Sequence, residues 1–197
     1  MNYPGKFIVI YGINNLGKTT QAKFLVEKLN AEGRTAEYLK YPIYDLEPAG
    51  PIINEYLRGG NPHQITPREL QTLHVLNRTQ YEPTFKERLT AGTTVIAEDY
   101  VGTGMAWGMG AGVDEEYLAK LNAHLLKEDI AFLFDGERFT ESTEENHTHE
   151  TDSALLKKVR AAHLHLAHKY DWHIINANAS VEEIHQTLLE KLSTILL

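Results

Sequence analysis

The hydrophobic residues of this chain follow two alternating patterns. Short apolar runs such as 7–11 are typical of strands that are buried on both faces of a parallel sheet. Between these runs, apolar residues recur every three or four positions, as Ala22, Leu25 and Leu29 do, which is the spacing of a helix with one buried face. The runs predict strands at 7–11, 35–41, 94–97, 130–134 and 172–176. The periodic segments predict helices at 19–30, 52–57, 66–90, 114–126 and 153–169, and a last helix that begins after residue 180.

Local signals fix several of these boundaries. Residues 66–69 read Thr-Pro-Arg-Glu, which combines an N-cap threonine with proline at the first helical position and glutamate at the third. Residues 180–183 carry a second capping box, and Asp114 is a further N-cap candidate. The glycines of 102–112 predict a loop, and the polar, acidic segment 136–150 predicts another.

The regular alternation of strands and helices decides the fold class. Sequential strands joined by helices form parallel sheets, and the helices cover both faces. We therefore expect an α/β three-layer α/β/α sandwich with a five-stranded parallel sheet. The chain shows no internal repeat or low-complexity linker, so we expect a single domain over 1–197, with a mobile lid at about 136–150.

Composition narrows the classes of partner. The formal net charge of −8 argues against nucleic acid or an anionic membrane as the main partner. The chain has no cysteine, which excludes disulfide scaffolds, thiolate metal sites and a cysteine nucleophile. No apolar run approaches 18 residues, and the N-terminus lacks the apolar stretch of a signal peptide. We therefore expect a cytoplasmic protein without a membrane span.

A phosphate-binding motif follows the first predicted strand. Residues 12–19 match G-x-x-x-x-G-K-[ST] at every fixed position, and a predicted helix follows directly. The backbone N–H groups of such a loop surround phosphate oxygens, Lys18 reaches the β- and γ-phosphates, and Thr19 is a Mg²⁺ ligand. The predicted ATP-binding residues are Gly12, Ile13, Asn14, Asn15, Leu16, Gly17, Lys18, Thr19 and Thr20.

A P-loop is shared by kinases, GTPases and other ATPases, so further features must distinguish them. None of the asparagines in the chain is followed by lysine. The chain therefore lacks the Asn-Lys-x-Asp motif with which GTPases recognise guanine. A chain of 197 residues has little room for a second large domain. Both observations favour a small kinase with a P-loop NTPase fold.

Five segments together resemble the thymidylate kinase family over nearly the whole chain. They are the opening strand and P-loop through Gln21, the acceptor loop Tyr41-Pro42-Ile43-Tyr44, the helical segment Leu73 to Arg78, the strand and turn from Val95 to Gly108, and the closing segment Tyr170 to His185. This resemblance implies ATP- and Mg²⁺-dependent phosphorylation of dTMP to dTDP and, as in family members, a homodimer.

The resemblance also implies roles for single residues. Arg78 would hydrogen-bond the thymine edge, His74 would stack on the base, and Trp107 would favour deoxyribose. Lys18 and Arg138 would stabilise the transferring phosphate, while Thr19 and Glu98 would hold Mg²⁺. The acceptor-binding set is Tyr41, Pro42, Tyr44, His74, Arg78, Asp99, Tyr100, Gly104 and Trp107.

Spacing alone supports two parts of this assignment. Glu98 and Asp99 follow an apolar strand, so they can reach a metal ion or its waters at the sheet edge. His74 and Arg78 lie at i and i+4 of a predicted helix and therefore share one face.

The chain departs from the family where acceptor phosphate is bound. Asp99 stands where the family has arginine, and Ile43 and Tyr44 stand where an arginine would grip the phosphate. The P-loop carries Asn14 and Asn15 and no arginine, and Arg138 is the only Lys or Arg from 135 to 152. A chain that binds a phosphorylated acceptor would then need other basic residues in place of these arginines. The candidates are Lys40, Arg58 and Arg160.

These departures leave two alternatives to a dTMP kinase. A deoxynucleoside kinase of related fold would act on an acceptor without phosphate and would need fewer arginines. A non-catalytic, ATP-binding relative would bind nucleotide without turnover. The intact Lys18 and Thr19 argue against the second alternative.

Overall fold

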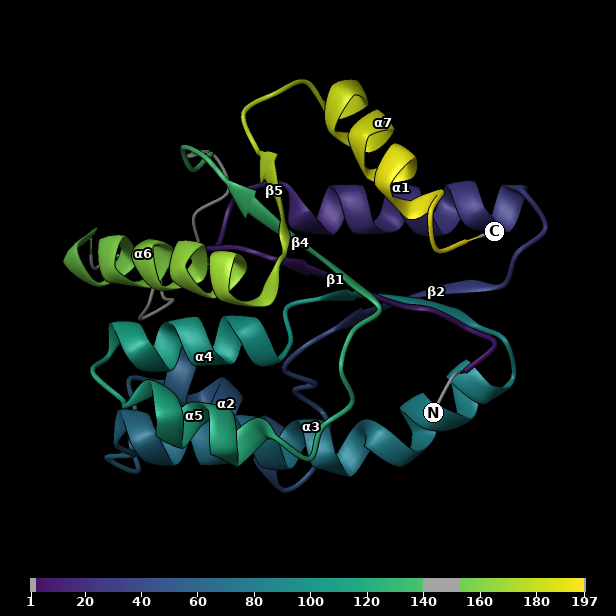
Figure 1. Cartoon of the computed structure of the whole chain (residues 1–197). Helices are drawn as coiled ribbons and strands as arrows, with labels where there is room; N and C mark the ends of the chain where they lie inside the picture. The colour runs from purple at the N-terminus through teal and green to yellow at the C-terminus, as the bar shows by residue number, and fades with distance from the viewer. Residues whose placement is uncertain (1–2, 140–152, 197) are drawn as a thin grey trace.

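The computed structural model describes residues 3–139 and 153–196. Five strands form one parallel sheet in the order β2-β3-β1-β4-β5 (Figure 1). The strands are β1 Phe7–Tyr11, β2 Ala36–Lys40, β3 Thr94–Glu98, β4 Ile130–Asp135 and β5 His173–Asn176. All five strands predicted from the sequence are confirmed. The central strand β1 is buried along its whole length because β3 and β4 flank it and helices cover both of its faces.

Helices lie on both faces of the sheet, which confirms the three-layer α/β/α fold (Figure 1). Helices α1 and α7 contact one another on one face, while α3, α4, α5 and α6 lie on the other and α2 packs against α3. The helices are α1 Lys18–Ala31, α2 Ala49–Arg58, α3 Pro67–Thr90, α4 Val101–Gly110, α5 Glu115–Asn122, α6 Ser153–Tyr170 and α7 Val181–Leu192.

The predicted helix caps are present. Thr66 accepts a hydrogen bond from the N–H of Glu69 while the Glu69 carboxylate accepts one from the N–H of Thr66, and Ser180 and Glu183 repeat this arrangement. Asp114 caps α5, as expected. Each such cap satisfies backbone donors that a helix leaves unpaired at its start.

The predicted loop at 102–112 is wrong, because α4 occupies most of it. We expected a loop since glycine is unfavourable inside helices. In the structure these glycines allow close packing: a Cβ on Gly102 would lie 2.3 Å from Trp172, and one on Gly110 would lie 2.5 Å from Val159. Close packing of α4 against α6 therefore outweighs the low intrinsic helix propensity.

Two smaller boundary differences concern other helices. Helix α2 begins at Ala49, three residues before the predicted start, and α5 ends at Asn122, before the predicted end at 126. The predicted end of α3 is confirmed, since this helix continues through Pro83 to Thr90. None of the helices in the described ranges combines the length and the apolar character that a membrane span requires.

Candidate active site

The carboxyl ends of the strands surround one cavity of about 820 Å³. Ligands of open α/β sheets bind at this edge, where the strand order reverses, and here β1 lies at that reversal, between β3 and β4. Most residues predicted for the site line the cavity: Asn14, Asn15, Leu16, Gly17, Lys18, Thr19, Thr20, Tyr41, Pro42, Tyr44, His74, Arg78, Glu98, Asp99, Tyr100, Gly104, Trp107 and Arg138. Gly12 and Ile13 are outside this lining and bind Lys18 through their carbonyl groups.

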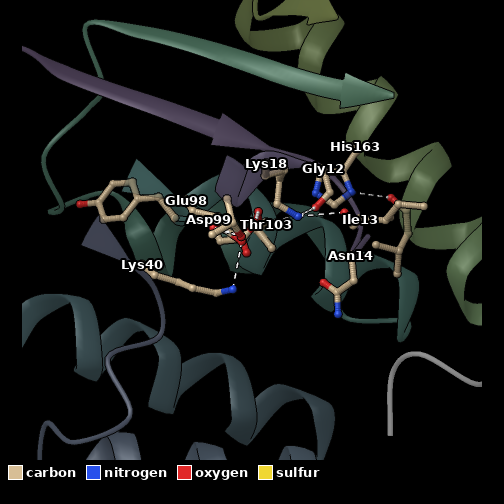
Figure 2. Close-up of polar contacts among 12 residues, drawn as sticks. Gly12, Ile13, Asn14, Lys18, Lys40, Glu98, Asp99, Thr103 and His163 are labelled. Carbon is tan, nitrogen blue, oxygen red and sulfur yellow. Dashed lines mark hydrogen bonds and ion pairs between the residues drawn. The ribbon is translucent and has the colours of Figure 1, made fainter. Parts of the chain in front are cut away.

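The P-loop connects β1 to α1 in a tight turn. Gly12 has a φ of 141°, and a Cβ there would lie 2.6 Å from the carbonyl oxygen of Phe134, so only glycine fits. Gly17 has a φ of 78° immediately before α1 begins. The Lys18 Nζ donates to the carbonyl oxygens of Gly12 and Ile13, each at 2.8 Å, as Figure 2 shows. The loop is thereby folded around its own lysine.

Glu98 joins three elements at the end of β3. Its carboxylate accepts hydrogen bonds from Thr19 Oγ1 at 2.7 Å and from the Tyr38 hydroxyl at 2.5 Å, and it pairs with Lys40 Nζ at 3.0 Å. Burial alone would raise the pKa of Glu98, but the charges of Lys18 and Lys40, together with the hydrogen bonds from Tyr38 and Thr19, outweigh burial and lower it. An ionised carboxylate beside the Thr19 hydroxyl is a hard oxygen pair of the kind that Mg²⁺ binds.

Asp99 follows Glu98 in a left-handed backbone conformation with a φ of 60°. It accepts a hydrogen bond from Thr103 Oγ1 at 2.8 Å, and one carboxylate oxygen lies 3.6 Å from Lys18 Nζ. Burial raises the pKa of Asp99; the charge of Lys18 opposes this shift and that of Glu98 reinforces it. The two neighbouring carboxyl groups therefore have pKa values that move in opposite directions, an arrangement that is frequent at functional sites.

One face of α3 forms the other end of the cavity. Gln71, His74 and Arg78 all line it, and Arg78 is 4% exposed. The Arg78 Nη2 donates to the carbonyl oxygen of Tyr100 at 2.8 Å, and Nη1 donates to Asn122 Oδ1 at 3.2 Å. Burial lowers the pKa of Arg78. Gln71 was missed by sequence reasoning, although its position three residues before His74 is a signal that could have found it.

The acceptor loop after β2 is held by α3. The side chain of Asn77 is completely buried; it donates to the carbonyl oxygen of Ile43 at 2.8 Å and accepts from the Ile43 N–H at 2.9 Å. The ring of Tyr41 lies against Tyr100, with centroids 5.2 Å apart, and the Tyr41–Pro42 peptide is cis. The sequence motif included Asn77, but only the structure shows that it fixes this loop.

The three candidate basic residues have different positions. Arg160 forms a two-bond ion pair with Asp135, at 2.6 and 2.9 Å, and does not line the cavity. Lys40 and Arg58 both line it. The Arg58 guanidinium lies 4.8 Å from the centroid of the Tyr44 ring. Arg160 is therefore outside the cavity, whereas Lys40 and Arg58 are part of its lining.

The segment after β4 closes over the P-loop. Arg138 Nε donates to the carbonyl oxygen of Asn14 at 3.3 Å, and the N–H of Phe139 donates to that of Asn15 at 2.9 Å. The remainder of the predicted lid, 140–150, lies outside the described residues. The cavity wall nearby is apolar and suits a planar base; its residues, which sequence reasoning missed, are Phe139, Ala177, Ala179, Val181 and Ile184.

The turn between β1 and α1 is rich in glycine and is wrapped around the buried Lys18. Such a turn defines a P-loop nucleotide-binding protein. The cavity extends from this loop to a second, polar recess on α3, so the fold and site together define a two-substrate P-loop kinase. The sequence model of the family described as thymidylate kinase matches residues 10–188. The chain therefore belongs to the thymidylate kinase family.

Individual relatives agree with this assignment. The chain is 32% identical over 196 residues to the probable thymidylate kinase of Methanocaldococcus jannaschii, covering 96% of each chain. It is 26% identical to the thymidylate kinase of Homo sapiens, covering 93% of this chain and 88% of the human one. The solved structure of thymidylate kinase from Candida albicans is similar to this chain with a TM-score of 0.81, and the match covers 97% of this chain and 92% of the Candida chain. The two sequences are 21% identical, so this similarity supports the fold alone.

Proposed function

We propose that this protein transfers the γ-phosphoryl group of ATP to dTMP. In this reaction the bond between the γ-phosphorus and the β,γ-bridging oxygen breaks, and a dTMP phosphate oxygen bonds to that phosphorus, which gives ADP and dTDP. The observation that carries the proposal is the single cavity with the P-loop at one end and the Arg78 recess at the other. Family membership supports dTMP as the acceptor.

The donor end supplies charge and orientation, which phosphoryl transfer needs more than covalent help. Lys18 is poised at the loop to neutralise charge on the β- and γ-phosphates, and Arg138, whose Nε contacts Asn14, lies beside it. Thr19 and Glu98 would hold Mg²⁺, since their oxygens lie 2.7 Å apart and the pKa of Glu98 is lowered. Mg²⁺ would neutralise charge between the β- and γ-phosphates.

The acceptor end would recognise the base and the sugar. The Arg78 guanidinium is fixed by Tyr100 and Asn122 and can donate to the thymine edge from a defined position. His74, on the same helix face, would stack on the base, and Trp107 would lie against the sugar. A Cβ on Gly104 would lie 2.6 Å from Arg78 Nη2, so glycine leaves the room that this guanidinium occupies.

A coupled assay of ADP release tests the proposal directly. With ATP and Mg²⁺, we expect turnover with dTMP that far exceeds turnover with thymidine, dUMP, UMP or CMP. Lys18→Met should reduce turnover by at least 100-fold while the chain stays folded, because the buried charge at the phosphates is lost. Lys28→Met is the matched control, since Lys28 pairs with Glu32 on the solvent side of α1 and should leave turnover unchanged. Equal loss in both variants would overturn the role of Lys18.

A second candidate, a deoxynucleoside kinase, is favoured by one observation. Asp99 places a carboxyl group 3.6 Å from Lys18, where it would repel an acceptor phosphate but could accept the proton of an acceptor hydroxyl. Turnover with thymidine and none with dTMP would support this candidate. ATP binding without turnover of either acceptor would instead support a non-catalytic relative.

Two further properties belong to the proposal. We expect a homodimer, as in family members, which light scattering on the purified chain would measure. We also expect a cytoplasmic location, which fractionation of cells that produce the protein would test.

A further inference from the structure

The acceptor end of the cavity needs positive charge that the family pattern does not provide here. Ile43 and Asp99 stand at two positions where the resemblance places arginine, and Asp99 adds a carboxyl group. A phosphate monoester carries up to two negative charges and binds best to lysine or arginine through charge-assisted hydrogen bonds. Within 3–139 and 153–196, the lysines and arginines that line the cavity are Lys18, Lys40, Arg58, Arg78 and Arg138.

Three of these five cations are committed to other parts of the cavity. Lys18 and Arg138 both contact carbonyl groups of the P-loop and therefore lie at the donor end. Arg78 is buried in the floor, where its two terminal nitrogens bond Asn122 and Tyr100. Lys40 and Arg58 lie instead at the ends of β2 and α2, the two elements that flank the acceptor loop.

Lys40 reaches the point where donor and acceptor must meet. It is the last residue of β2, its side chain is 49% exposed, and its Nζ lies 3.0 Å from Glu98. Glu98 also bonds Thr19, so the Lys40 ammonium is separated from the donor end by one carboxylate. Figure 2 shows the Lys40 ammonium pointing toward Glu98 and Asp99.

Arg58 is positioned by aromatic and polar contacts. It is the last residue of α2, its guanidinium lies over the Tyr44 ring, and its Nη1 donates to Asn54 at 2.9 Å. Tyr44 belongs to the acceptor loop, so this contact holds a planar cation beside that loop. A guanidinium stacked on an aromatic ring keeps N–H groups in its plane, which suits bidentate phosphate binding.

We propose that Lys40 and Arg58 bind the phosphate of the acceptor, in place of the arginines that Ile43 and Asp99 replace. The proposal rests on the proposed dTMP kinase function and deepens it. Lys40 offsets the charge of Glu98 and Asp99 at the transfer point, and Arg58 closes on the phosphate from α2. The two residues thereby select nucleoside monophosphates over nucleosides.

The experiment compares binding of dTMP and thymidine by calorimetry, together with steady-state kinetics. The variants are Lys40→Met, Arg58→Gln and the double variant, with Lys40→Arg as the conservative replacement. Lys28→Met is a control because Lys28 also forms a 3.0 Å ion pair, with Glu32, outside the cavity. Arg68→Gln is the second control because Arg68 stacks on Tyr117 at 3.9 Å, also outside this cavity.

The expected result is selective for phosphate. Each single variant should raise the Kd for dTMP about tenfold and the double variant about 100-fold, with the Kd for thymidine and the KM for ATP changed less than twofold. Lys40→Arg should restore most of the dTMP affinity, since it keeps the charge. The controls should bind dTMP as the wild-type chain does.

Other results overturn the inference in distinguishable ways. A double variant that binds dTMP within twofold of wild type would overturn it and leave the proposed function standing. Equal losses for dTMP and thymidine would show a merely structural role, and a rise in the KM for ATP alone would show that Lys40 serves the donor end. A wild-type chain that binds and phosphorylates thymidine but not dTMP would overturn both the inference and the proposed function.

Discussion

The contact between Asn77 and Ile43 predicts that one buried amide controls the acceptor loop. Asn77→Ala removes both hydrogen bonds, at 2.9 and 2.8 Å, that join α3 to the backbone of Ile43. Each bond satisfies a backbone group that would otherwise lose its partner. The loop carries Tyr41, Pro42 and Tyr44 along the cavity wall, so loosening it should weaken acceptor binding more than ATP binding.

The magnitude follows from burial. Leaving a buried polar group unpaired costs about 1–3 kcal/mol. Asn77→Ala leaves two such groups, the N–H and the carbonyl group of Ile43, facing the site of a side chain that is 0% exposed. Ile43 itself is half-buried, so water can recover part of the loss. We therefore expect the free energy of unfolding to fall by about 2–4 kcal/mol for the two groups together. A chain of this size should then lose about 4–16 °C in Tm. The KM for dTMP should rise about 5- to 30-fold.

Asn30 provides a matched control for this prediction. Its side chain forms the same two-bond contact with the backbone of Ala36, at 2.9 Å for each bond, but it is exposed and far from the acceptor loop. Asn30→Ala should lower the free energy of unfolding by a similar amount, about 2–4 kcal/mol, because the N–H and carbonyl groups that it leaves unpaired belong to Ala36, which is 6% exposed. It should leave the KM for dTMP unchanged, because Ala36 lies outside the acceptor loop. Urea unfolding and initial-rate kinetics measure both quantities. An unchanged KM for dTMP in Asn77→Ala, or an equal rise in this KM in the two variants, would refute the reasoning.

Three other outcomes are expected. Burial lowers the pKa of His163 from 6.5 to about 3. As the pH falls, this histidine is therefore protonated in the unfolded chain before it is protonated in the folded chain, which favours unfolding. The free energy of unfolding should fall by about 2 kcal/mol from neutral pH to pH 5. Urea titrations of wild type and His163→Asn at both pH values check this, since the variant should lose that difference. Gly104→Ala should displace Arg78 and weaken dTMP binding in calorimetry while ATP binding stays the same. Gly110→Ala should overpack against Val159 and lower stability by about 1–3 kcal/mol in thermal melts; an unchanged Tm would contradict the close packing.

The sequence predicts most of the framework because the signals for it are local. Runs such as 7–11 are apolar at every position, and a strand with helices on both faces requires that pattern. The P-loop is equally local, since its glycines, Lys18 and Thr19 are contiguous. Thr66 and Glu69 identified the start of α3 for the same reason, because a capping box involves residues only three positions apart.

The rest depends on contacts between distant segments. Helix α4 was missed because the low helix propensity of glycine is visible in the sequence while the partners Trp172 and Val159 are not. The spacing of Gly102, Ala106 and Gly110 at every fourth position was an available signal, since it places small residues along one helix face. The approach of Lys40 to Glu98 across β2 and β3 likewise requires the strand pairing.

The position of Glu98 between Thr19 and Lys40 has a thermodynamic consequence. One carboxylate bonds a hydroxyl from the donor end and an ammonium from the acceptor end. A ligand that draws either partner away changes the charge that the other partner faces. Occupancy of the two ends is therefore linked, and by reciprocity ATP must alter the affinity for the acceptor by the same factor by which the acceptor alters the affinity for ATP.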